Sequence, residues 1–477
     1  MRYDLVIVGL GSGGLVAAEF AASLGLRVAA VERSRVGGDC LWTGCVPSKA
    51  LLASAKVAHH LRTADRYGMT AVEPEIDLAA VWRRIRAIQQ QIADTDDDPT
   101  RYEAMGVEVV RGEARLVGKN SVAVGERTLE TRRILLCTGS RPAVPAVPGL
   151  EETGFLTSEN VFELERPPRS VAIMGGGPIG VELAQALNRL GIRVTLLQRV
   201  DRLLPRDEPE LAAILAEVLR AEGVDVRLDT EASRVVRERE VKVVESATGE
   251  RFEAEEIVVA AGRTPTTDGL GLEETGVEVG ARGVVVDERM RTGVPSIYAV
   301  GDVAGRYLFT HSAGHEGAMA VRDMFFPGKG KVSDLVPWTT FTDPELAHVG
   351  LTAAEARERH GEAKIAVERA DLSHSDRARA DGATEGRIVL VTARDKLVGA
   401  HILAPAAGEM IHEPALAIRE RMKLRNLASM IHVYPTMTTS MNLLAAEAAY
   451  RYARRFGWLI RLNRRGGSRS RRRRWRG

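Results

Sequence analysis

The alternation of apolar and polar positions is most regular in two stretches of the chain. The first reads DLVIVGLGSGGLVAAEFAASLGLRVAAVER and begins at Asp4; the second reads SVAIMGGGPIGVELAQALNRLGIRVTLLQR and begins at Ser170. In each, a short apolar run typical of a buried strand leads into a glycine-rich turn, a segment with helical spacing of apolar residues, and a second apolar run. The pattern predicts two strand–turn–helix–strand units, and this repeat is the strongest organising signal in the sequence.

Both predicted turns follow the spacing G-x-G-x-x-G. Their glycines are Gly9, Gly11 and Gly14 in the first unit, and Gly175, Gly177 and Gly180 in the second. A side chain would clash in such a turn, or keep the backbone away from a pyrophosphate that binds at the positive N-terminus of the following helix. One such motif is a weak signal, but two in full strand–turn–helix–strand context are strong. We therefore predict an α/β chain with two Rossmann-like dinucleotide-binding domains.

The residue at the end of the second predicted strand differs between the two units. It lies 23 residues after the first glycine in both, and is Glu32 in the first unit and Gln198 in the second. A carboxylate there accepts hydrogen bonds from a ribose diol, which suits the adenosine of FAD or NAD. Gln198 would not repel a 2′-phosphate, and Arg199 and Arg202 could bind one. This favours NADPH at the second unit, with NADH as the alternative if these arginines only solvate a loop.

Length and composition restrict the classes of protein that fit. At 477 residues the chain is too long for one compact core and suggests about two to four domains. Its three cysteines are too few for a secreted disulfide scaffold, no export signal is readable, and no apolar run approaches the length of a membrane span. We expect a soluble, cytoplasmic protein in a reducing compartment, where a permanent disulfide staple is the less common use of paired cysteines.

Two of the three cysteines lie in one short segment, GGDCLWTGCVPSK, which covers residues 37–49. Cys40 and Cys45 could form a structural staple, half of a metal site, or a redox pair. On an ideal helix they would lie roughly 7.5 Å apart along the axis, so a bridge requires a distorted helix start, which Gly44 permits. A zinc site is disfavoured because no second C-x-x-C or close histidine pair is present, and no resident metal site is predicted. Cys137, in the apolar run RILLCTG, is expected in the core.

Several segments occur in an order that resembles one enzyme family. They are the first glycine turn with Glu32, GGDCLWTGCVPSKALL, ILLCTGSRP, the second glycine turn, VVAAGRTP and SIYAVGDVAG. In this order they are similar to the FAD-dependent pyridine nucleotide-disulfide oxidoreductases, which include dihydrolipoamide dehydrogenase, glutathione reductase and mercuric reductase. The resemblance covers residues 1 to about 450, and C-x4-C-V-P-S-K is its most specific part.

The resemblance implies two Rossmann-like domains, for FAD and NAD(P), and a C-terminal α+β interface domain that forms a homodimer. The implied bounds are 1–148 and 265–336 for a discontinuous FAD-binding domain, 149–264 for the NAD(P)-binding domain, 337–455 for the interface domain and 456–477 for a basic tail.

The family pattern also implies roles for single residues. Cys45 would make the charge-transfer contact with the flavin, Cys40 would be the interchange thiol, and Lys49 would lie near the flavin and pair with Glu182. Asp302 would bind the ribitol or pyrophosphate end of FAD. Further cofactor-binding positions in the matching motifs are Gly139, Gly262, Arg263 and Gly301. Because a strained bridge at a helix start is easily reduced and the helix N-terminus stabilises the released thiolate, the redox pair is the favoured interpretation.

One departure from the family limits the expected activity. In its disulfide reductases a C-terminal H-P-T-x-x-E supplies a histidine base and an orienting glutamate, whereas this chain reads MIHVYPTMTTSMN. Tyr434 stands in the place of the histidine and Thr439 in that of the glutamate, while His432 aligns with a different histidine. A phenol of pKa ~10 is a poor base near neutrality, and losing such help costs about 10²–10⁴ in rate. Efficient dihydrolipoamide dehydrogenase or glutathione reductase activity is therefore disfavoured.

Acceptors that need no thiol–disulfide exchange suit this sequence better. We predict that electrons pass from NADPH through FAD and the cysteine pair to a soft metal ion, as in mercuric reductases, or to a quinone. The sequence shows neither the C-terminal vicinal cysteines nor the N-terminal metal-binding module usual in mercuric reductases. Met430, Met437 and Met441 are soft ligands in principle but more often core residues. The alternatives are a dihydrolipoamide dehydrogenase-like enzyme in which Tyr434 or His432 replaces the base, and a redox-sensing membrane-associated flavoprotein with little turnover.

Charge is unevenly distributed along the chain. From residue 451 onward there are 12 arginines and no acid, and since the whole chain carries +2, the first 450 residues carry about −10. The tail combines arginines with Phe456, Trp458 and Leu459, a combination that can dock on an anionic membrane surface. A solvated extension is the alternative, and specific nucleic-acid binding is not expected.

Overall fold

The computed structural model describes residues 2–326, 328, 330–459 and 461. The chain divides into two compact units, each described separately below. The N-terminal unit comprises Met1–Leu204 and Leu219–Val336, and the C-terminal unit comprises Pro205–Val218 and Pro337–Gly477.

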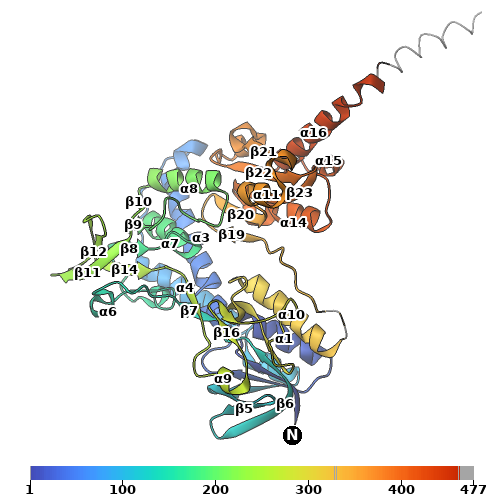
Figure 1. The fold of residues 1–477 in the computed structure, drawn as a ribbon. Coiled ribbons are helices and arrows are strands. Elements are labelled where there is room, and N and C mark those ends of the chain that lie inside the picture. Colours follow the sequence, from blue (N-terminus) through green and yellow to red (C-terminus); the bar gives the residue numbers. More distant parts are fainter. Residues whose placement is uncertain (1, 327, 329, 460, 462–477) are drawn as a thin grey trace, which may run out of the picture. The chain divides into compact units, whose positions relative to one another are not determined.

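A mixed sheet forms the centre of the N-terminal unit, in the order β3-β2-β1-β6-β5-β4, with β18 paired to β6 (Figure 1). Its strands are β1 (Tyr3–Val8), β2 (Val28–Glu32), β3 (Val107–Arg111), β4 (Ala114–Gly118), β5 (Ser121–Val124), β6 (Arg127–Leu136) and β18 (Ile297–Ala299). The pairs of β1 with β2 and β6, β2 with β3, and β6 with β18 are parallel, whereas β4, β5 and β6 form an antiparallel meander. Strand β2 is buried throughout, as expected for a strand covered on both faces.

Two helices pack side by side next to this sheet (Figure 1). They are α1 (Ser12–Ser23) and α10 (Thr310–Phe325). Small residues allow their close approach, since a Cβ at Gly317 would lie 2.4 Å from the Gly13 carbonyl oxygen. Apolar side chains of α1 and α10 form one core with β1 and β2. A second core lies among the strands and includes Val122, Leu129 and Leu270.

The second repeat builds a parallel sheet in the order β10-β9-β8-β14. These strands are β8 (Ser170–Met174), β9 (Arg193–Leu197), β10 (Asp225–Arg227) and β14 (Glu256–Val259), and helix α7 (Pro178–Arg189) connects β8 to β9. An antiparallel sheet of β11 (Ala232–Glu238), β12 (Val241–Ser246) and β13 (Arg251–Ala254) adjoins it. The two predicted strand–turn–helix–strand units are thus β1-α1-β2 and β8-α7-β9, and the predicted fold class is confirmed.

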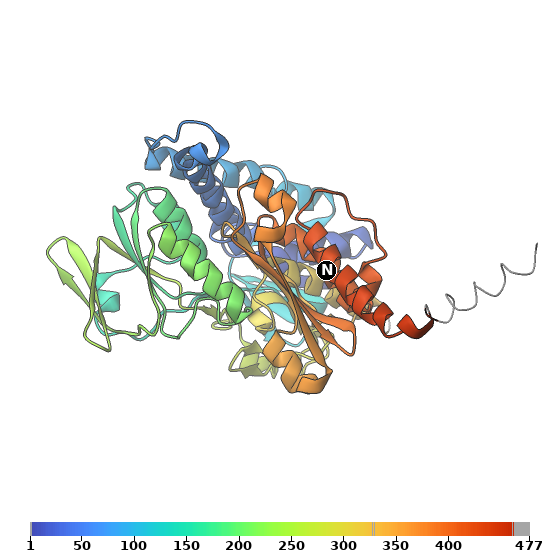
Figure 2. The same cartoon turned by 90° about the horizontal axis from the view of Figure 1, so that it is seen from above.

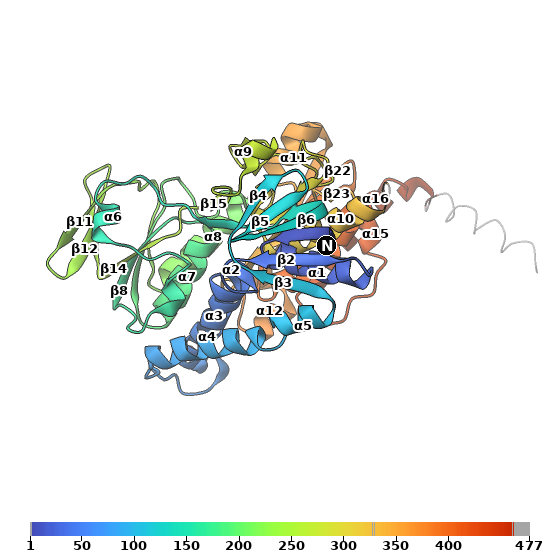
Figure 3. The ribbon, with the colours of Figure 1, turned by 90° about the horizontal axis from the view of Figure 1, so that it is seen from below.

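Further helices complete this unit. Those drawn in shades of blue in Figure 3 are α2 (Gly38–Trp42), α3 (Cys45–Arg62), α4 (Leu78–Ala93) and α5 (Pro99–Ala104), and the short α6 (Leu150–Thr153) and α9 (Leu272–Thr275) come later in the chain. Helix α3 packs against both α4 and α7, and so connects the segment after the first repeat with the helix of the second.

The C-terminal unit is an antiparallel sheet with helices packed against it (Figure 2). Its strand order is β19-β20-β23-β22-β21, with bounds β19 (Trp338–Thr340), β20 (Glu345–Gly350), β21 (Ile365–Asp371), β22 (Arg387–Ala393) and β23 (Lys396–Ala404). Its helices are α11 (Ala353–His360), α12 (Asp376–Ala380), α13 (Ala407–Met410), α14 (His412–Arg419), α15 (Leu424–Leu427) and α16 (Thr439–Arg454). Segment 205–218, which holds most of α8 (Pro209–Ala221), belongs to this unit although it lies inside the region predicted to bind NAD(P).

Candidate active site

The cysteine segment forms two helices with a break between them. Cys40 lies in α2, and Cys45 is the first residue of α3. The break falls at Thr43 and Gly44, which caps α3 with φ −127° and ψ −105°; a Cβ at Gly44 would lie 2.9 Å from the Asp39 carbonyl oxygen. The predicted distortion of the helix start is therefore present, and it brings the two thiols together instead of spacing them along one helix axis.

The surroundings of Cys45 favour its thiolate. Its Sγ lies 3.2 Å from Oγ1 of Thr310, the first residue of α10. The pKa of Cys45 is lowered to about 6, mainly by a hydrogen bond with the Cys40 thiol, and further by Thr310 and the positive charge of Lys49. The same hydrogen bond, together with burial, raises the pKa of Cys40. In the reduced pair, the charge is expected on Cys45 and the proton on Cys40 near neutral pH.

An ion pair joins the cysteine helix to the second repeat. Lys49 Nζ, one turn after Cys45 on α3, lies 2.9 Å and 3.2 Å from the two carboxylate oxygens of Glu182 on α7. The Glu182 side chain is only 7% exposed, so the lysine compensates an otherwise buried charge. Lys49 also adds the positive potential that helps to lower the Cys45 pKa.

A polar network surrounds Asp302, in the predicted FAD-binding motif GDV. Its Oδ2 accepts a hydrogen bond of 2.5 Å from Ser140 Oγ and lies 3.4 Å from Arg263 Nε. Arg263 also donates to Ser140 Oγ at 2.6 Å and forms an ion pair with Asp39, next to Cys40. Burial raises the pKa of Asp302. Three motifs far apart in the sequence thus meet beside the cysteine segment, and the neighbouring glycines Gly139, Gly262 and Gly301 all have positive φ.

The first glycine turn has the geometry that a pyrophosphate requires. Gly9 has φ +101°, and a Cβ there would lie 2.4 Å from the Cys137 carbonyl oxygen, while one at Gly14 would lie 1.9 Å from the Gly9 carbonyl oxygen. Gly11 stands at the N-cap of α1. At the end of β2, the buried Glu32 accepts one backbone N–H on each carboxylate oxygen, from Leu10 and Ser34, both at 2.8 Å. These two bonds leave acceptor capacity on both oxygens for a ribose diol, so the residues present fit the adenosine half of FAD.

The second turn repeats this backbone with a different side chain beside it. A Cβ at Gly175 would lie 2.4 Å from the Ala260 carbonyl oxygen and one at Gly180 1.9 Å from that of Gly175, whereas a Cβ at Gly177 meets nothing within 4 Å. That open space is where a nucleotide pyrophosphate can approach the start of α7.

The side chain beside the second turn is a buried amide. Gln198 accepts from Gly176 N–H at 3.2 Å and donates to the Arg202 carbonyl oxygen at 3.0 Å, so it ties the turn to the loop that follows β9. In that loop Arg199 is exposed, and Arg202 lies 3.7 Å from the Asp201 carboxylate. Strand β9 ends at Leu197, so Gln198 directly follows the strand, and its amide carries no negative charge.

Tyr434, in the C-terminal unit, is held by a carboxylate. Its hydroxyl donates a hydrogen bond of 2.8 Å to Asp376 Oδ2, and this bond raises the pKa of the phenol above its ordinary value. The side chain is otherwise exposed. Near neutral pH, even less of Tyr434 is therefore present as the phenolate than of a free phenol, so it is less available as a base.

His432 is engaged through both ring nitrogens. Its Nε2 lies 3.1 Å and 3.2 Å from the carboxylate oxygens of Glu413, and its Nδ1 lies 3.3 Å from the Met430 carbonyl oxygen. The imidazole is 8% exposed. Thr439, where the family's glutamate would stand, hydrogen-bonds Thr436 and the Val433 carbonyl oxygen instead.

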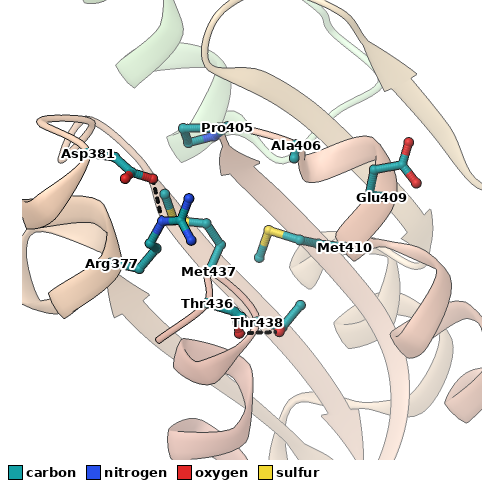
Figure 4. Close-up of a pocket in the computed structure, with 9 residues that line it drawn as sticks. All are labelled: Arg377, Asp381, Pro405, Ala406, Glu409, Met410, Thr436, Met437 and Thr438. Atoms are coloured by element: carbon teal, nitrogen blue, oxygen red, sulfur yellow. Dashed lines mark hydrogen bonds and ion pairs between the residues drawn. The ribbon is translucent and has the colours of Figure 1, made fainter. Parts of the chain in front are cut away.

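An open pocket of about 340 Å³ lies next to this segment, within the C-terminal unit (Figure 4). Its lining includes Met410, Met437 and the ion-paired Arg377 and Asp381. Met441, by contrast, is buried in the core, and Met430 is partly exposed. The three methionines singled out in the sequence therefore do not share one site. The described part of the chain contains no cluster of three or more His, Cys, Asp or Glu side chains that could hold a metal ion.

Comparison with known proteins decides the family. Residues 3–317 match the family described as pyridine nucleotide-disulphide oxidoreductase, and residues 336–445 match its dimerisation domain. The chain belongs to this family. It is thus an oxidoreductase of the FAD-dependent pyridine nucleotide-disulfide class, and the dimerisation domain supports the expected homodimer.

Individual members are similar over nearly their whole length. A dihydrolipoyl dehydrogenase of Thermus scotoductus is 36% identical over 471 residues, covering 94% of this chain and 98% of that protein. A mercuric reductase of Streptomyces lividans is 37% identical over 460 residues, covering 93% and 95%. Among solved structures, the Cu(II) complex of the HOCl-induced flavoprotein disulfide reductase RclA from Escherichia coli has a TM-score of 0.84 and 27% identity, covering 94% of this chain and 99% of that one.

Some polar residues of this pyridine nucleotide-disulfide oxidoreductase were not singled out in the sequence. Thr310 follows Cys45 by 265 positions, and Asp39 and Ser140 reach Arg263 across distances of 224 and 123 positions. Asp39 and Ser140 lie inside the motifs GGDCLWTGCVPSK and ILLCTGSRP, but nothing local relates either of them to Arg263, and Thr310 lies in no motif. Residues 460 and 462–477 of the predicted basic tail lie outside the described residues, and no helix within the described ones is long and apolar enough to cross a bilayer.

Proposed function

We propose that this oxidoreductase uses NADPH to reduce a soft metal ion, such as Hg(II) or Cu(II), or a quinone, through FAD and the Cys40–Cys45 pair. The observation that carries the proposal is the electrostatic asymmetry of the pair: a low-pKa Cys45 hydrogen-bonded to Thr310 and near Lys49, beside a Cys40 that keeps its proton. When bound, FAD supplies the two-electron relay between the nicotinamide and the cysteines. The domain bounds 1–148 with 265–336, 149–264 and 337–455 are part of this proposal.

The cysteines receive and pass on two electrons in each cycle. Reduction of the disulfide consumes two electrons and one proton when the product is a Cys45 thiolate and a Cys40 thiol. Reoxidation of the cysteines passes both electrons to the acceptor, so one NADPH reduces one Hg(II) to Hg(0), or two Cu(II) to two Cu(I). Thiolates bind such soft cations strongly. The step needs no base that accepts a proton from a substrate thiol.

The C-terminal segment supports an acceptor of this kind over a disulfide. Tyr434 is bound to Asp376 with a raised pKa, and His432 is occupied by Glu413 and Met430, so neither offers a free basic nitrogen or phenolate. The relatives do not decide between these acceptors, since dihydrolipoyl dehydrogenases and mercuric reductases both match the chain. The Cu(II) complex of RclA adds support for a metal ion. A dihydrolipoamide dehydrogenase-like activity stays as the second candidate.

NADPH is proposed as the donor because of the second glycine turn. A buried Gln198 replaces the acid that would repel a 2′-phosphate, and the exposed Arg199 lies next to it in the chain. Arg202 is the second cation, although Asp201 competes for it.

The test is an anaerobic stopped-flow experiment on the purified, FAD-loaded dimer. We expect fast flavin reduction by NADPH, a long-wavelength thiolate–flavin absorbance, and rapid reoxidation by Hg(II), Cu(II) or a quinone but slow reoxidation by lipoamide or oxidised glutathione. Restoring the family's residues in the double variant Tyr434→His, Thr439→Glu should raise lipoamide turnover by about 10²-fold or more. Reoxidation of the wild type by lipoamide as fast as by the metal ions would overturn the choice of acceptor.

Association with an anionic membrane surface is proposed for the C-terminal tail. Phe456, Trp458 and Leu459 are 41%, 54% and 45% exposed, and the sequence after them is rich in arginine. Exposed apolar rings next to cations suit an anionic bilayer. Full-length protein should sediment with phosphatidylserine vesicles at low salt, and a chain ending at residue 455 should not. Equal recovery of both, or binding to DNA but not to vesicles, would contradict the proposal.

A further inference from the structure

Three aromatic side chains form a row across the sheet of the C-terminal unit. Trp338 on β19 is the register partner of His348 on β20, which is the partner of His401 on β23. Cross-strand partners lie on the same face, and the rings confirm it: the Trp338 and His348 centroids are 3.7 Å apart with planes 12° from parallel. The imidazoles are 1% and 0% exposed. The activity proposed above uses neither histidine.

The segment Arg206–Glu210, just before and at the start of α8, contacts this row. The Arg206 guanidinium lies 5.2 Å from the Trp338 ring centroid, a cation–π contact. The indole N–H of Trp338 donates a hydrogen bond of 2.9 Å to Asp207 Oδ1. Asp207 is 3% exposed, and burial raises its pKa to about 6.

Two glutamates of the same segment continue the contact. Glu208 Oε2 lies 3.8 Å from His401 Nε2 and accepts a hydrogen bond of 3.0 Å from the Ala353 N–H. Glu210 accepts from Arg369 on β21 at 2.8 Å. The charged residues of this segment therefore contact both the buried aromatic row and strand β21.

The two histidines take part in three hydrogen bonds. Their Nδ1 atoms are 3.0 Å apart, His348 Nε2 lies 2.9 Å from the Gly350 carbonyl oxygen, and His401 Nε2 lies 3.1 Å from the Leu351 carbonyl oxygen. A carbonyl oxygen can only accept, so both Nε2 atoms must donate, and one Nδ1 must donate to the other. The three bonds need three ring protons, but two neutral imidazoles supply only two.

The burial of His348 and His401 opposes a third proton on their two rings. Burial lowers the pKa of His348, and lowers that of His401 to about 4, whereas it raises that of Glu208. On the other side, a neutral pair would leave one hydrogen bond unmade inside the protein, and the Glu208 carboxylate offers a nearby negative charge. The other charged groups that act on these three residues are Arg206, Glu210, Glu355, Arg357 and Arg369.

We propose that His348 and His401 together hold one excess proton, balanced by the Glu208 carboxylate, and that this buried proton keeps Arg206–Glu210 seated against the sheet. Loss of the proton at alkaline pH breaks one of the three bonds and removes the positive charge that lies 3.8 Å from the Glu208 carboxylate. The segment then loosens, and with it the start of α8. Because residues 205–218 lie in sequence within the proposed NAD(P)-binding region, the histidine pair makes the docking of that region's segment sensitive to pH.

The first test counts the protons directly. Full-length, FAD-loaded enzyme with ¹⁵N-labelled histidine is studied by NMR at pH 7, with His348→Gln and His401→Gln to assign the two rings. We expect one of the two rings to have both nitrogens protonated and the other to have a proton on Nε2 alone. Two rings with a single protonated nitrogen each would overturn the proposal. Either variant alone suffices for the assignment if the other does not fold.

The second test measures docking of the segment by hydrogen–deuterium exchange of peptides from 205–218. The rates are first corrected for the intrinsic pH dependence of amide exchange. Exchange in the wild type should then rise with pH, by up to about tenfold per pH unit above the pKa of the histidine pair, because release of one proton is linked to opening of the segment. In His348→Gln the slope should vanish, since glutamine can donate to Gly350 without titrating. His60→Gln, at an exposed position on α3, is the matched control. A slope unchanged in His348→Gln would overturn the link, and neither test depends on the electron acceptor.

Discussion

The two strand–turn–helix–strand units have the same backbone at their glycine turns and different side chains around them. A Cβ would meet a carbonyl oxygen at 2.4 Å at Gly9 and at Gly175, and at 1.9 Å at Gly14 and at Gly180. After the first unit the chain continues into the cysteine pair, and after the second into Arg199 and Arg202. The comparison teaches that steric constraints fix the backbone of both turns, and that the two units differ in the residue at or directly after the end of the second strand and in the residues that follow it.

The residues at the end of β2 and directly after β9 show this difference most clearly. Glu32 only accepts: both of its carboxylate oxygens bind a backbone N–H. Gln198 accepts through one atom of its amide and donates through the other. An amide can hold the loop in place without adding a negative charge beside the glycine turn, and a carboxylate cannot.

The largest expected effect comes from a substitution in the cysteine pair that follows the first unit and leaves the second unit unchanged. In Cys45→Ser we expect turnover with any acceptor to fall by about 10³-fold or more, and the long-wavelength thiolate–flavin band to disappear, because the nucleophilic thiolate is gone. NADPH should still reduce the flavin, since the second unit is intact. Stopped-flow absorbance checks both statements; unchanged turnover would show that the pair is not used.

A matched pair of glycine variants tests whether the two turns are equivalent in backbone but not in ligand. Gly180→Ala should leave FAD bound and raise KM for NADPH by more than about tenfold, because its Cβ would displace the turn at the start of α7. Gly14→Ala should instead release FAD during purification. The flavin-to-protein absorbance ratio and steady-state kinetics distinguish them, and loss of FAD from Gly180→Ala would contradict the assignment of ligands.

Replacing Gln198 should change the preference between NADPH and NADH and little else. Gln198→Glu should raise KM for NADPH by about tenfold, or about 1.4 kcal/mol, while leaving NADH within a few-fold, because a carboxylate repels the 2′-phosphate. Arg199→Gln should have a smaller effect in the same direction. If both variants change NADPH and NADH equally, the second unit does not recognise the 2′-phosphate.

The smallest predicted effect is a titration. The pKa of Cys45 is lowered from its ordinary 9.0 to about 6, so the thiolate is stabilised by the folded protein and persists until the pH falls through about 6. Alkylation of the NADPH-reduced enzyme by iodoacetamide should therefore be half-maximal near pH 6, and the thiolate–flavin band should fade below it. Cys45→Ser provides the baseline. A midpoint near 9 would mean that Cys40, Thr310 and Lys49 do not stabilise the charge.

Local patterns in the sequence were sufficient for the repeated core. The apolar runs and glycine spacing predicted β1-α1-β2 and β8-α7-β9, and the strand carrying Glu32 ends at that residue. The broken helix start was also predicted, because five residues of helix cannot hold two cysteines within bonding range. These features depend on neighbours a few positions apart, which is the range over which periodicity and turn chemistry are informative.

Contacts between distant residues could not be predicted in the same way. Thr310 gave no signal as a partner of Cys45, because nothing local relates the start of α10 to the cysteine helix. The histidine row was missed for the same reason, since the register that pairs His348 with His401 joins positions 53 apart. A one-residue shift in that register would place the two rings on opposite faces of the sheet.

Because Cys137 is buried, the number of thiols that react with a reagent reports on Cys40 and Cys45 alone. The side chain of Cys137 is only 8% exposed, so a reagent cannot reach it in the folded protein, whereas Cys40 and Cys45 are both partly exposed. A thiol reagent at neutral pH should therefore find two sulfhydryl groups in the folded, reduced protein, none in the folded, oxidised protein, and all three only after unfolding in reductant. The stoichiometry of a colorimetric assay thus reports the oxidation state of Cys40 and Cys45 without any substitution.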